Sequence, residues 1–227
     1  FESYEKEQSY NAPVGKYAAF AYVTALNALL ANSEHRLIIS DTTVVFWAES
    51  ANPDFQILFN AAMNPKEDNQ KMLCAILEKI SRGLPPKEGV NPETPFYILG
   101  LAPNAARLSV RFFLQDSFGN FLKHIQQHYS DMEIEKAPYE FPYLSPYWLL
   151  RETVNPNAKD KSGSHLLSGA VMRSILTGAP YPQALMNAVM LRIHAEQDDS
   201  ERHIKKITRG RAAIIKLSLI HISEPTR

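Results

Sequence analysis

The sequence contains one cysteine, Cys74, and no long hydrophobic run. A single cysteine cannot form an internal disulfide or a cysteine-pair metal cluster, and this scarcity is typical of a reducing compartment. No apolar run approaches the ~18 residues that indicate a transmembrane helix, and no charged segment followed by an apolar stretch marks a signal peptide. We therefore expect a cytoplasmic protein that does not enter a membrane.

The charged residues show no excess of either sign. Lys and Arg together number 24, as do Asp and Glu, so the formal net charge is zero. This balance excludes a uniformly basic nucleic-acid-binding protein but leaves room for a basic patch on one face. Apolar residues make up 45% of the chain and charged residues 21%, a mixture that is typical of soluble globular proteins and excludes disorder and a coiled coil.

Sequence signatures of common active sites are missing. The chain has no nucleophile elbow, phosphate-binding loop, zinc-protease motif or dinucleotide-binding motif. His124, His128 and Asp131 are spaced i, i+4 and i+7, so they could share one helix face and bind a metal, or the histidines could be solvated on a surface helix. Cys74 lies beside Leu73 in a helical pattern, which favours a buried thiol over a nucleophile. We expect no enzymatic activity and no cofactor, with a metal-dependent hydrolase as an alternative.

The hydrophobic periodicity predicts an α+β protein, in which a mixed α/β part is followed by an all-helical part. Residues 1–140 are predicted to contain a buried central helix at 17–30, two β-hairpins, and amphipathic helices at 68–82 and 117–129. Residues 141–217 show helical patterns only. The predicted strands are 36–39, 43–47, 96–101 and 106–115, and the later helices are 146–152, 164–177, 182–195 and 200–217.

The amino-acid sequence of residues 218–227 differs in character from the helix before it. From Leu219 they break the helical pattern that precedes them, and they resemble translated sequencing-adapter read-through. We therefore interpret 218–227 as a non-native tail and exclude it from the predicted fold.

The strand at 106–115 alternates between two faces. Arg107, Arg111 and Phe113 fall on one face, and apolar residues fall on the other. Arginine and aromatic side chains on a sheet face are typical of proteins that hold single-stranded nucleic acid, through phosphate pairing and base stacking. The alternative is that Phe113 packs under a helix while the arginines form salt bridges.

The last predicted helix is rich in basic residues, with Glu201 as its one acid. Such a helix could dock through one stripe and bind phosphates through the other, because clustered Lys and Arg bind nucleic acid by counterion release. A solvated face is the alternative. Arg173 and Arg192 lie among apolar helix positions. Such long side chains can extend their charged ends to solvent or point into a groove. The candidate phosphate contacts are Arg107, Arg111, Arg173, Arg192, Arg202, Lys205, Lys206, Arg209, Arg211 and Lys216.

Several long motifs, in order from residue 1 to about 217, carry a family resemblance. They include EQSYNAPV (7–14), DTTVVFWAE (41–49), FYILGLAPNAAR (96–107), ILTGAPYP (175–182) and RAAIIK (211–216). The sequence resembles the large subunit of the subtype I-C (Dvulg-type) CRISPR Cascade surveillance complex. Such subunits are considerably longer, so the resemblance implies an internal fragment.

The resemblance implies a function without catalysis. The large subunit of such a complex helps recognise a short motif that flanks the target duplex and steadies the unwinding DNA, while guide–target pairing reads the sequence. The implied partners are the crRNA, target double-stranded DNA, the backbone and guide-handle-binding subunits, a small subunit and a recruited helicase-nuclease. By this resemblance, Gln8 and Asn11 belong to a candidate contact with the DNA motif. A purely structural module, whose apolar helices at 164–195 dock on other subunits, remains an alternative.

Overall fold

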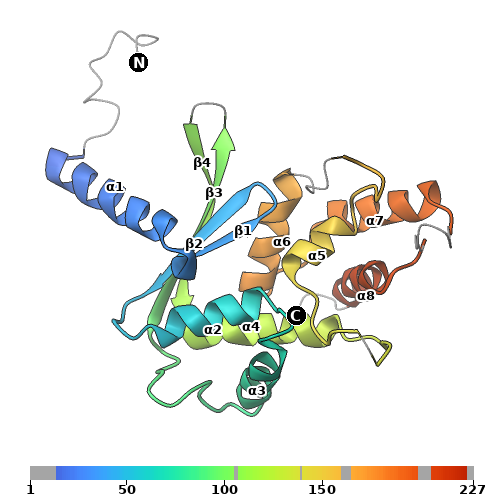
Figure 1. Cartoon of the computed structure of the whole chain (residues 1–227), viewed down its shortest axis with the longest axis horizontal. Coiled ribbons are helices and arrows are strands. Elements are labelled where there is room, and N and C mark those ends of the chain that lie inside the picture. The colour runs from blue at the N-terminus through green and yellow to red at the C-terminus, as the bar shows by residue number, and fades with distance from the viewer. Residues whose placement is uncertain (1–13, 105–106, 139, 160–164, 199–205, 224–227) are drawn as a thin grey trace, which may run out of the picture.

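Four antiparallel strands form a meander through the centre of the chain in the computed structural model (Figure 1). The structure describes residues 14–104, 107–138, 140–159, 165–198 and 206–223. Each strand pairs with the next along the chain. The strands are β1 (Arg36–Ile39), β2 (Thr42–Ala48), β3 (Pro95–Asn104) and β4 (Arg107–Ser117). Both predicted hairpins are therefore confirmed.

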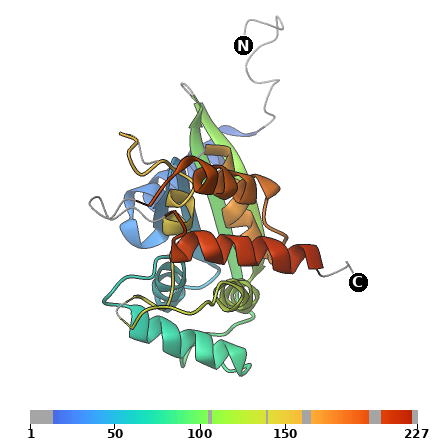
Figure 2. The same ribbon diagram turned by 90° about the vertical axis from the view of Figure 1, so that its right-hand side faces the viewer.

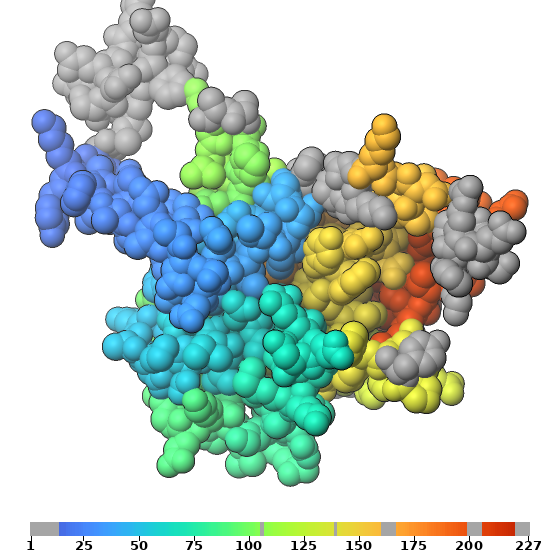
Figure 3. Space-filling view, in the orientation of Figure 1, coloured from blue at the N-terminus to red at the C-terminus, as the bar shows by residue number. Residues whose placement is uncertain are grey.

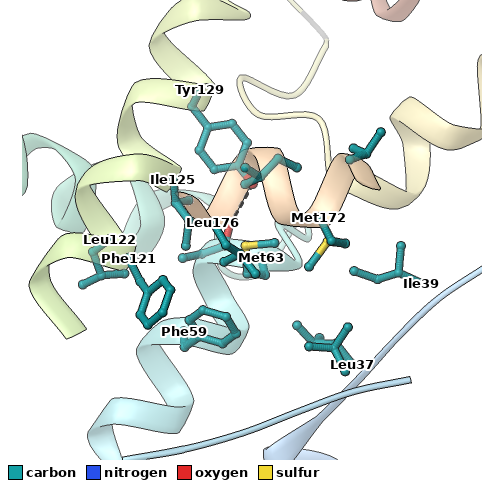
Figure 4. Close-up of a cluster of buried hydrophobic side chains, with 14 of the residues drawn as sticks. Leu37, Ile39, Phe59, Met63, Phe121, Leu122, Ile125, Tyr129, Met172 and Leu176 are labelled. Atoms are coloured by element: carbon teal, nitrogen blue, oxygen red, sulfur yellow. Dashed lines mark hydrogen bonds between the residues drawn. The ribbon is translucent and has the colours of Figure 1, made fainter. Parts of the chain in front are cut away.

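One face of the sheet is covered by helices α2 (Asp54–Met63) and α4 (Phe118–Asp131). Leu37, Phe46 and Ile98 point to this side and are buried, because successive side chains of a strand face opposite sides. In the core shown in Figure 4, the Tyr129 hydroxyl of α4 donates a hydrogen bond of 2.7 Å to the Ala62 carbonyl of α2. This bond ties the two helices together beneath the sheet.

The second half of the chain contains helices and no strand within its described residues, as predicted. These helices are α5 (Pro146–Arg151), α6 (His165–Thr177), α7 (Gln183–Ala195) and α8 (Arg209–Ser223). Helix α6 packs on α4, and α8 lies against α7 and α4 (Figure 2). Buried residues of α6, α7 and α8 join the same hydrophobic cluster as the sheet, so one core continues across the boundary predicted near residue 140. None of the described helices combines the length and apolar character that a membrane crossing requires.

Local capping chemistry accounts for several helix ends. The side chains of Ser117 and Ser145 accept hydrogen bonds of 3.3 Å from backbone N–H groups in the first turns of α4 and α5, as N-cap residues do. Helix α3 (Gln70–Ser81) is followed by Gly83, which has a φ of 70°. Glycine adopts this left-handed conformation without the strain of a Cβ atom, so it ends the helix where the sequence predicts.

Helices α2 and α8 differ from the sequence-based expectation. Helix α2 was not predicted, because its buried residues lie on nearly all sides and give no amphipathic stripe. Helix α8 begins at Arg209, and Thr208 accepts a hydrogen bond of 3.1 Å from the Arg211 backbone N–H in its first turn. Residues 200–205 of the predicted helix lie outside the described part of the chain. Since α8 runs on to Ser223, the backbone shows no break at 218, and the origin of 218–227 stays a prediction.

Helix α1 (Lys16–Ala31) has no buried residue, so the prediction of a buried central helix is wrong. Tyr17 is 85% exposed, and Figure 1 shows α1 reaching away from the sheet on the side opposite to α6. At the C-terminal end of α1, Arg36 Nη1 donates a hydrogen bond of 2.6 Å to the Leu30 carbonyl. A helix that is apolar all round requires neighbours on every side, and the described residues supply them only near this end.

Gly100 of β3 lies directly beneath the ring of Phe112, its partner on β4. A Cβ atom on Gly100 would lie 2.5 Å from this ring, which is itself buried. We expect Gly100→Ala to lower the free energy of unfolding by about 1–3 kcal/mol, because the core must move to admit the methyl group. Urea unfolding measures the change. Gly15→Ala, whose added Cβ meets nothing within 4 Å, is the matched control, and an equal loss in both variants would contradict the clash.

Candidate nucleic-acid interface

The predicted contact residues do not form one stripe. Gln8, Asn11, Arg202 and Lys205 lie outside the described residues. The remaining eight are distributed over β4, α6, α7, α8 and the segment before α8. They are Arg107, Arg111, Arg173, Arg192, Lys206, Arg209, Arg211 and Lys216.

Arg211 lies inside the chain rather than on its surface. Its side chain is 4% exposed, with Nη1 2.8 Å from Glu196 Oε2 and Nε 3.4 Å from Glu152 Oε2. Glu152 follows α5 and Glu196 follows α7, so the guanidinium of α8 joins three helices. Arg192 Nη1 also approaches Glu196, at 3.9 Å. The structure therefore does not support Arg211 or Arg192 as phosphate contacts, because internal carboxylates already neutralise both.

Arg209 and Lys216 are also bonded within the chain. The two terminal nitrogens of Arg209 donate to the backbone carbonyls of 141–142, at 2.5 and 2.7 Å. Lys216 Nζ donates to the Glu133 carbonyl at 2.6 Å. These partners come from segments far away in the sequence. A count of neighbouring acids could not reveal them, and it therefore predicted a basic stripe that the described residues do not show.

A β-bulge turns Arg111 away from the face that its alternation predicts. The pairing of β3 with β4 shifts register after Gly100, and Arg111 is the extra residue on β4. Arg111 lies next to Gly169 of α6, with Nη2 3.8 Å from Asp41 Oδ2. Arg111 and Phe113 therefore do not share one face, which corrects the prediction.

Phe113 stays on the outer face of the sheet and is exposed, so it does not pack under a helix. It forms a row with Trp47 and Tyr97, in which the ring centroids lie 5.3 to 6.5 Å apart. The Tyr97 hydroxyl donates a hydrogen bond of 3.4 Å to Glu49 Oε2. The row offers rings for stacking, but the charge at its edge is a carboxylate, which repels phosphate.

The three other described cations among the predicted contacts are Arg107, Arg173 and Lys206. Arg107 at the start of β4 and Arg173 on α6 are exposed, and Lys206 before α8 is half-buried. They lie on three different elements. Any phosphate contacts that they make therefore belong to separate points of the surface rather than to one basic helix.

A groove of about 850 Å³ opens between β1, the end of α2 and the segment 140–148. Figure 3 views the molecule from this side. The blue and cyan surfaces of β1 and α2 lie on one side of the groove, and the gold surface of α5 lies on the other. Three cations line the groove, Arg36, Lys66 and Arg209, together with the carboxylates of Glu67 and Glu140. In this groove, described cations from distant segments meet large aromatic side chains.

One wall of this groove is aromatic. Phe141, Tyr147 and Trp148 line it, and each is between 43% and 51% exposed. The rings of Tyr147 and Trp148 meet edge to face, with centroids 6.1 Å apart. Arg151 Cζ lies 4.9 Å from the centroid of the Trp148 ring. Aromatic rings combined with arginine can stack against planar groups and attract anions.

Cys74 is exposed, so the prediction of a buried thiol is wrong. The buried stripe of α3 runs through Leu73 and Leu77, and the next residue along a helix turns by about 100°. Cys74 instead lines a second groove, of about 750 Å³, together with Tyr143. Burial, followed by the hydrogen bond with Cys74, raises the pKa of Tyr143 to about 12.

His124, His128 and Asp131 do not come together as a metal site. His124 Nδ1 lies 2.9 Å from the Leu176 carbonyl, and His128 Nδ1 is hydrogen-bonded to the Tyr181 hydroxyl. His128 is 3% exposed, so the alternative of a solvated histidine is wrong for this residue, whereas His124 is half-buried. Burial lowers the pKa of His128 to about 3. In the part of the chain that the structure describes, no group of three or more His, Cys, Asp or Glu side chains is arranged to hold a metal ion.

The sequence model of the Cas_Csd1 family, described as a CRISPR-associated protein, matches residues 1–225. The chain belongs to this family. The match includes every described helix and strand, from α1 to α8. No curated protein matches the chain.

Among the charged and aromatic groove residues of this Cas_Csd1-family protein, Arg209 was a predicted contact, whereas Arg36, Lys66, Tyr147 and Trp148 were not. Arg36 and Lys66 lie in segments that show no basic cluster in the sequence. Tyr147 and Trp148 did leave a local signal, because two aromatic residues directly precede Leu149 and Leu150 in one short helix. Four large side chains in a row on a helix cannot all face the core, so one pair must face outward.

Proposed function

We propose that the chain is part of the non-catalytic large subunit of a type I-C (Dvulg-type) Cascade complex, where it helps bind crRNA-guided target DNA in antiviral defence. The observation that carries this proposal is the Cas_Csd1 match over residues 1–225. The resemblance of its motifs to the type I-C large subunit supports the subtype. The proposed roles are recognition of a flanking motif and stabilisation of the DNA strands, because guide–target pairing reads the sequence.

The proposed partners follow from the same role. They are the crRNA, target double-stranded DNA, the backbone and guide-handle-binding subunits, the small subunit and a recruited helicase-nuclease, and the proposed location is the cytoplasm. In this proposal the chain breaks no bond, because cleavage belongs to the recruited helicase-nuclease. Its task is to hold nucleic-acid backbones and to position strands.

The alternative of a purely structural module rests on apolar helices at 164–195 that dock on other subunits. In the structure, Val171 and Ile175 of α6 and Leu185 and Val189 of α7 are buried in the chain's own core. These four side chains are therefore occupied within the chain, and the exposed large hydrophobic residue of α7 is Leu191. This packing favours the nucleic-acid role over the docking role for these helices.

Charge reversal at two exposed cations tests the nucleic-acid role. In the assembled complex with crRNA, we expect Arg107→Glu combined with Arg173→Glu to weaken binding of a target duplex. The slope of log K against log salt should become shallower by about two, because each lost phosphate contact removes about one unit. Titration of a labelled duplex at several salt concentrations measures both quantities.

Lys123→Glu is the matched control for this experiment. Lys123 is exposed on α4, and its reversal changes the net charge by the same amount per residue at a site that we do not assign to nucleic acid. If the complex assembles and the double variant keeps the wild-type affinity and slope, the two contacts are refuted. If a complex without the subunit binds target duplex as tightly as the complete complex, the proposed function is refuted.

A further inference from the structure

The aromatic wall of the groove is held rigidly by the core. Tyr147 and Trp148 lie on the outer side of α5, while Leu149 and Leu150 on its other side are buried. Ser145 caps the first turn, and its Oγ accepts a hydrogen bond of 3.3 Å from the Trp148 backbone N–H. The two rings are therefore positioned before any ligand arrives, which reduces the entropy lost on binding.

Arg151 adds a positive charge to this wall. Its Cζ lies 4.9 Å from the Trp148 centroid and 5.9 Å from the Tyr147 centroid, within the range of a cation–π contact. Arg151 does not itself line the groove, so it places positive charge next to the aromatic wall. Proteins that hold single-stranded nucleic acid use this combination, because bases stack on the rings while phosphates pair with the cations.

The remaining walls are also cationic on balance. Arg36 comes from β1, Lys66 follows α2, and Arg209 lies beside the aromatic wall. The groove also contains the carboxylates of Glu67 and Glu140, so its three cations and two carboxylates leave one net positive charge. This charge balance complements a polyanion better than it complements a neutral apolar peptide.

We propose that this groove binds a single-stranded polynucleotide, with bases stacked on Trp148 and Tyr147 and phosphates near Arg36 and Lys66. The inference rests on the proposed function and names the ligand of one site within it. Duplex DNA does not fit the proposal, because its bases are stacked on one another and only unstacked bases can splay onto a ring. A displaced DNA strand and an RNA segment share the required chemistry, so the experiment compares the two.

The tryptophans of the chain permit a local measurement. Trp47 and Trp148 are its two tryptophans, so Trp47→Phe leaves Trp148 as the one source of indole emission. We expect single-stranded DNA or RNA of about 12 nucleotides, within the site sizes of single-strand binders, to quench this emission in the full chain. A blunt duplex of the same sequence should not. Quenching by DNA alone identifies a DNA strand as the ligand, and quenching by RNA alone identifies RNA.

Substitutions on the wall give a second, independent readout. With Trp47 restored, Trp148→Ala is expected to weaken binding of the labelled single strand about 5- to 100-fold, as loss of one stacked base does. Tyr147→Ala should act in the same direction. Tyr17→Ala is the matched control, because Tyr17 is an exposed aromatic residue of α1 that does not line the groove. All three side chains are exposed, and circular dichroism verifies that each variant folds.

Three results would overturn the proposal. The first is no quenching by either single strand, and the second is an affinity loss with Tyr17→Ala equal to that with Trp148→Ala. The third is quenching by another subunit in the absence of polynucleotide, which would identify a protein as the occupant. None of these results decides the proposed function, because its test measures duplex binding by the complex after charge reversal at Arg107 and Arg173.

Discussion

Replacement of Arg211 by alanine is expected to lower the free energy of unfolding by about 3–5 kcal/mol, because it removes the nearest cation from two largely buried carboxylates. Arg211 contacts Glu152 and Glu196 at 3.4 and 2.8 Å, and Nη1 also donates to the Lys206 carbonyl at 2.9 Å. The variant loses all of these contacts at once. Urea unfolding at pH 7, followed by far-UV circular dichroism, measures the change.

The pH dependence of this loss identifies its cause. Burial raises the pKa of Glu152, against the lowering effects of the Thr208 hydroxyl and of Arg211. Without Arg211 the folded-state pKa of Glu152 should rise further, so the folded variant binds more protons than its unfolded chain and loses stability as the pH rises. The deficit of Arg211→Ala relative to the wild type should therefore be smaller near pH 4.5 than at pH 7.

Arg82→Ala is the matched control, because Arg82 forms an exposed i, i+4 pair with Glu78 on α3. Exposed pairs of this kind contribute at most a few tenths of a kcal/mol. If Arg211→Ala loses no more stability than Arg82→Ala, the stabilising role of the contacts of Arg211 with Glu152 and Glu196 is refuted. The contacts of Arg211 also connect two elements that line the groove, because Glu152 follows the helix that carries Trp148 and α8 begins at Arg209.

Elements whose ends depend on local chemistry could be predicted from the sequence. Gly83 ends α3 because glycine tolerates a positive φ, and Ser117 begins α4 because its side chain satisfies a backbone N–H group. The two hairpins followed from alternation and turn residues in the same way. In each case the deciding interactions lie within a few residues of one another.

Features that depend on distant partners could not be predicted. The sequence near Arg211 contains no sign of Glu152, and a bulge opposite Gly100 reverses the side on which Arg111 lies. The apolar sequence of helix α1 predicts burial, whereas its actual exposure depends on which other segments pack against it. The groove has the same character, because its residues come from β1, α2, α5 and α8 and meet only in the folded chain.

His128 is expected to make the chain less stable as the pH falls below about 6.5. Burial lowers its pKa to about 3, and Nε2 has no hydrogen-bond partner among the described residues, whereas an unfolded histidine binds a proton near pH 6.5. Between these values the unfolded chain binds a proton that the folded chain does not. Stability should therefore fall by about 1.4 kcal/mol for each pH unit through this window.

His128→Asn isolates this contribution from the titration of carboxylates. Asparagine places a polar atom near the position of Nδ1, so it can keep the contact with the Tyr181 hydroxyl, and it does not titrate. Carboxylates act on both proteins and cancel in the difference. Between pH 7 and pH 4.5, the difference in free energy of unfolding should shift by about 2–3 kcal/mol in favour of the variant.

Tyr181→Phe separates burial from hydrogen bonding as the cause. This variant removes the hydroxyl that bonds to His128 Nδ1 but leaves the partly buried ring against His128 of α4. If burial is the cause, the steep decline below pH 6.5 persists in Tyr181→Phe and is absent only from His128→Asn. If wild type and His128→Asn lose stability in parallel from pH 7 to 4.5, His128 is not held neutral in the fold. Glu152 would not account for that parallel loss, because burial raises its pKa and a carboxyl with a raised folded-state pKa favours the folded chain as the pH falls.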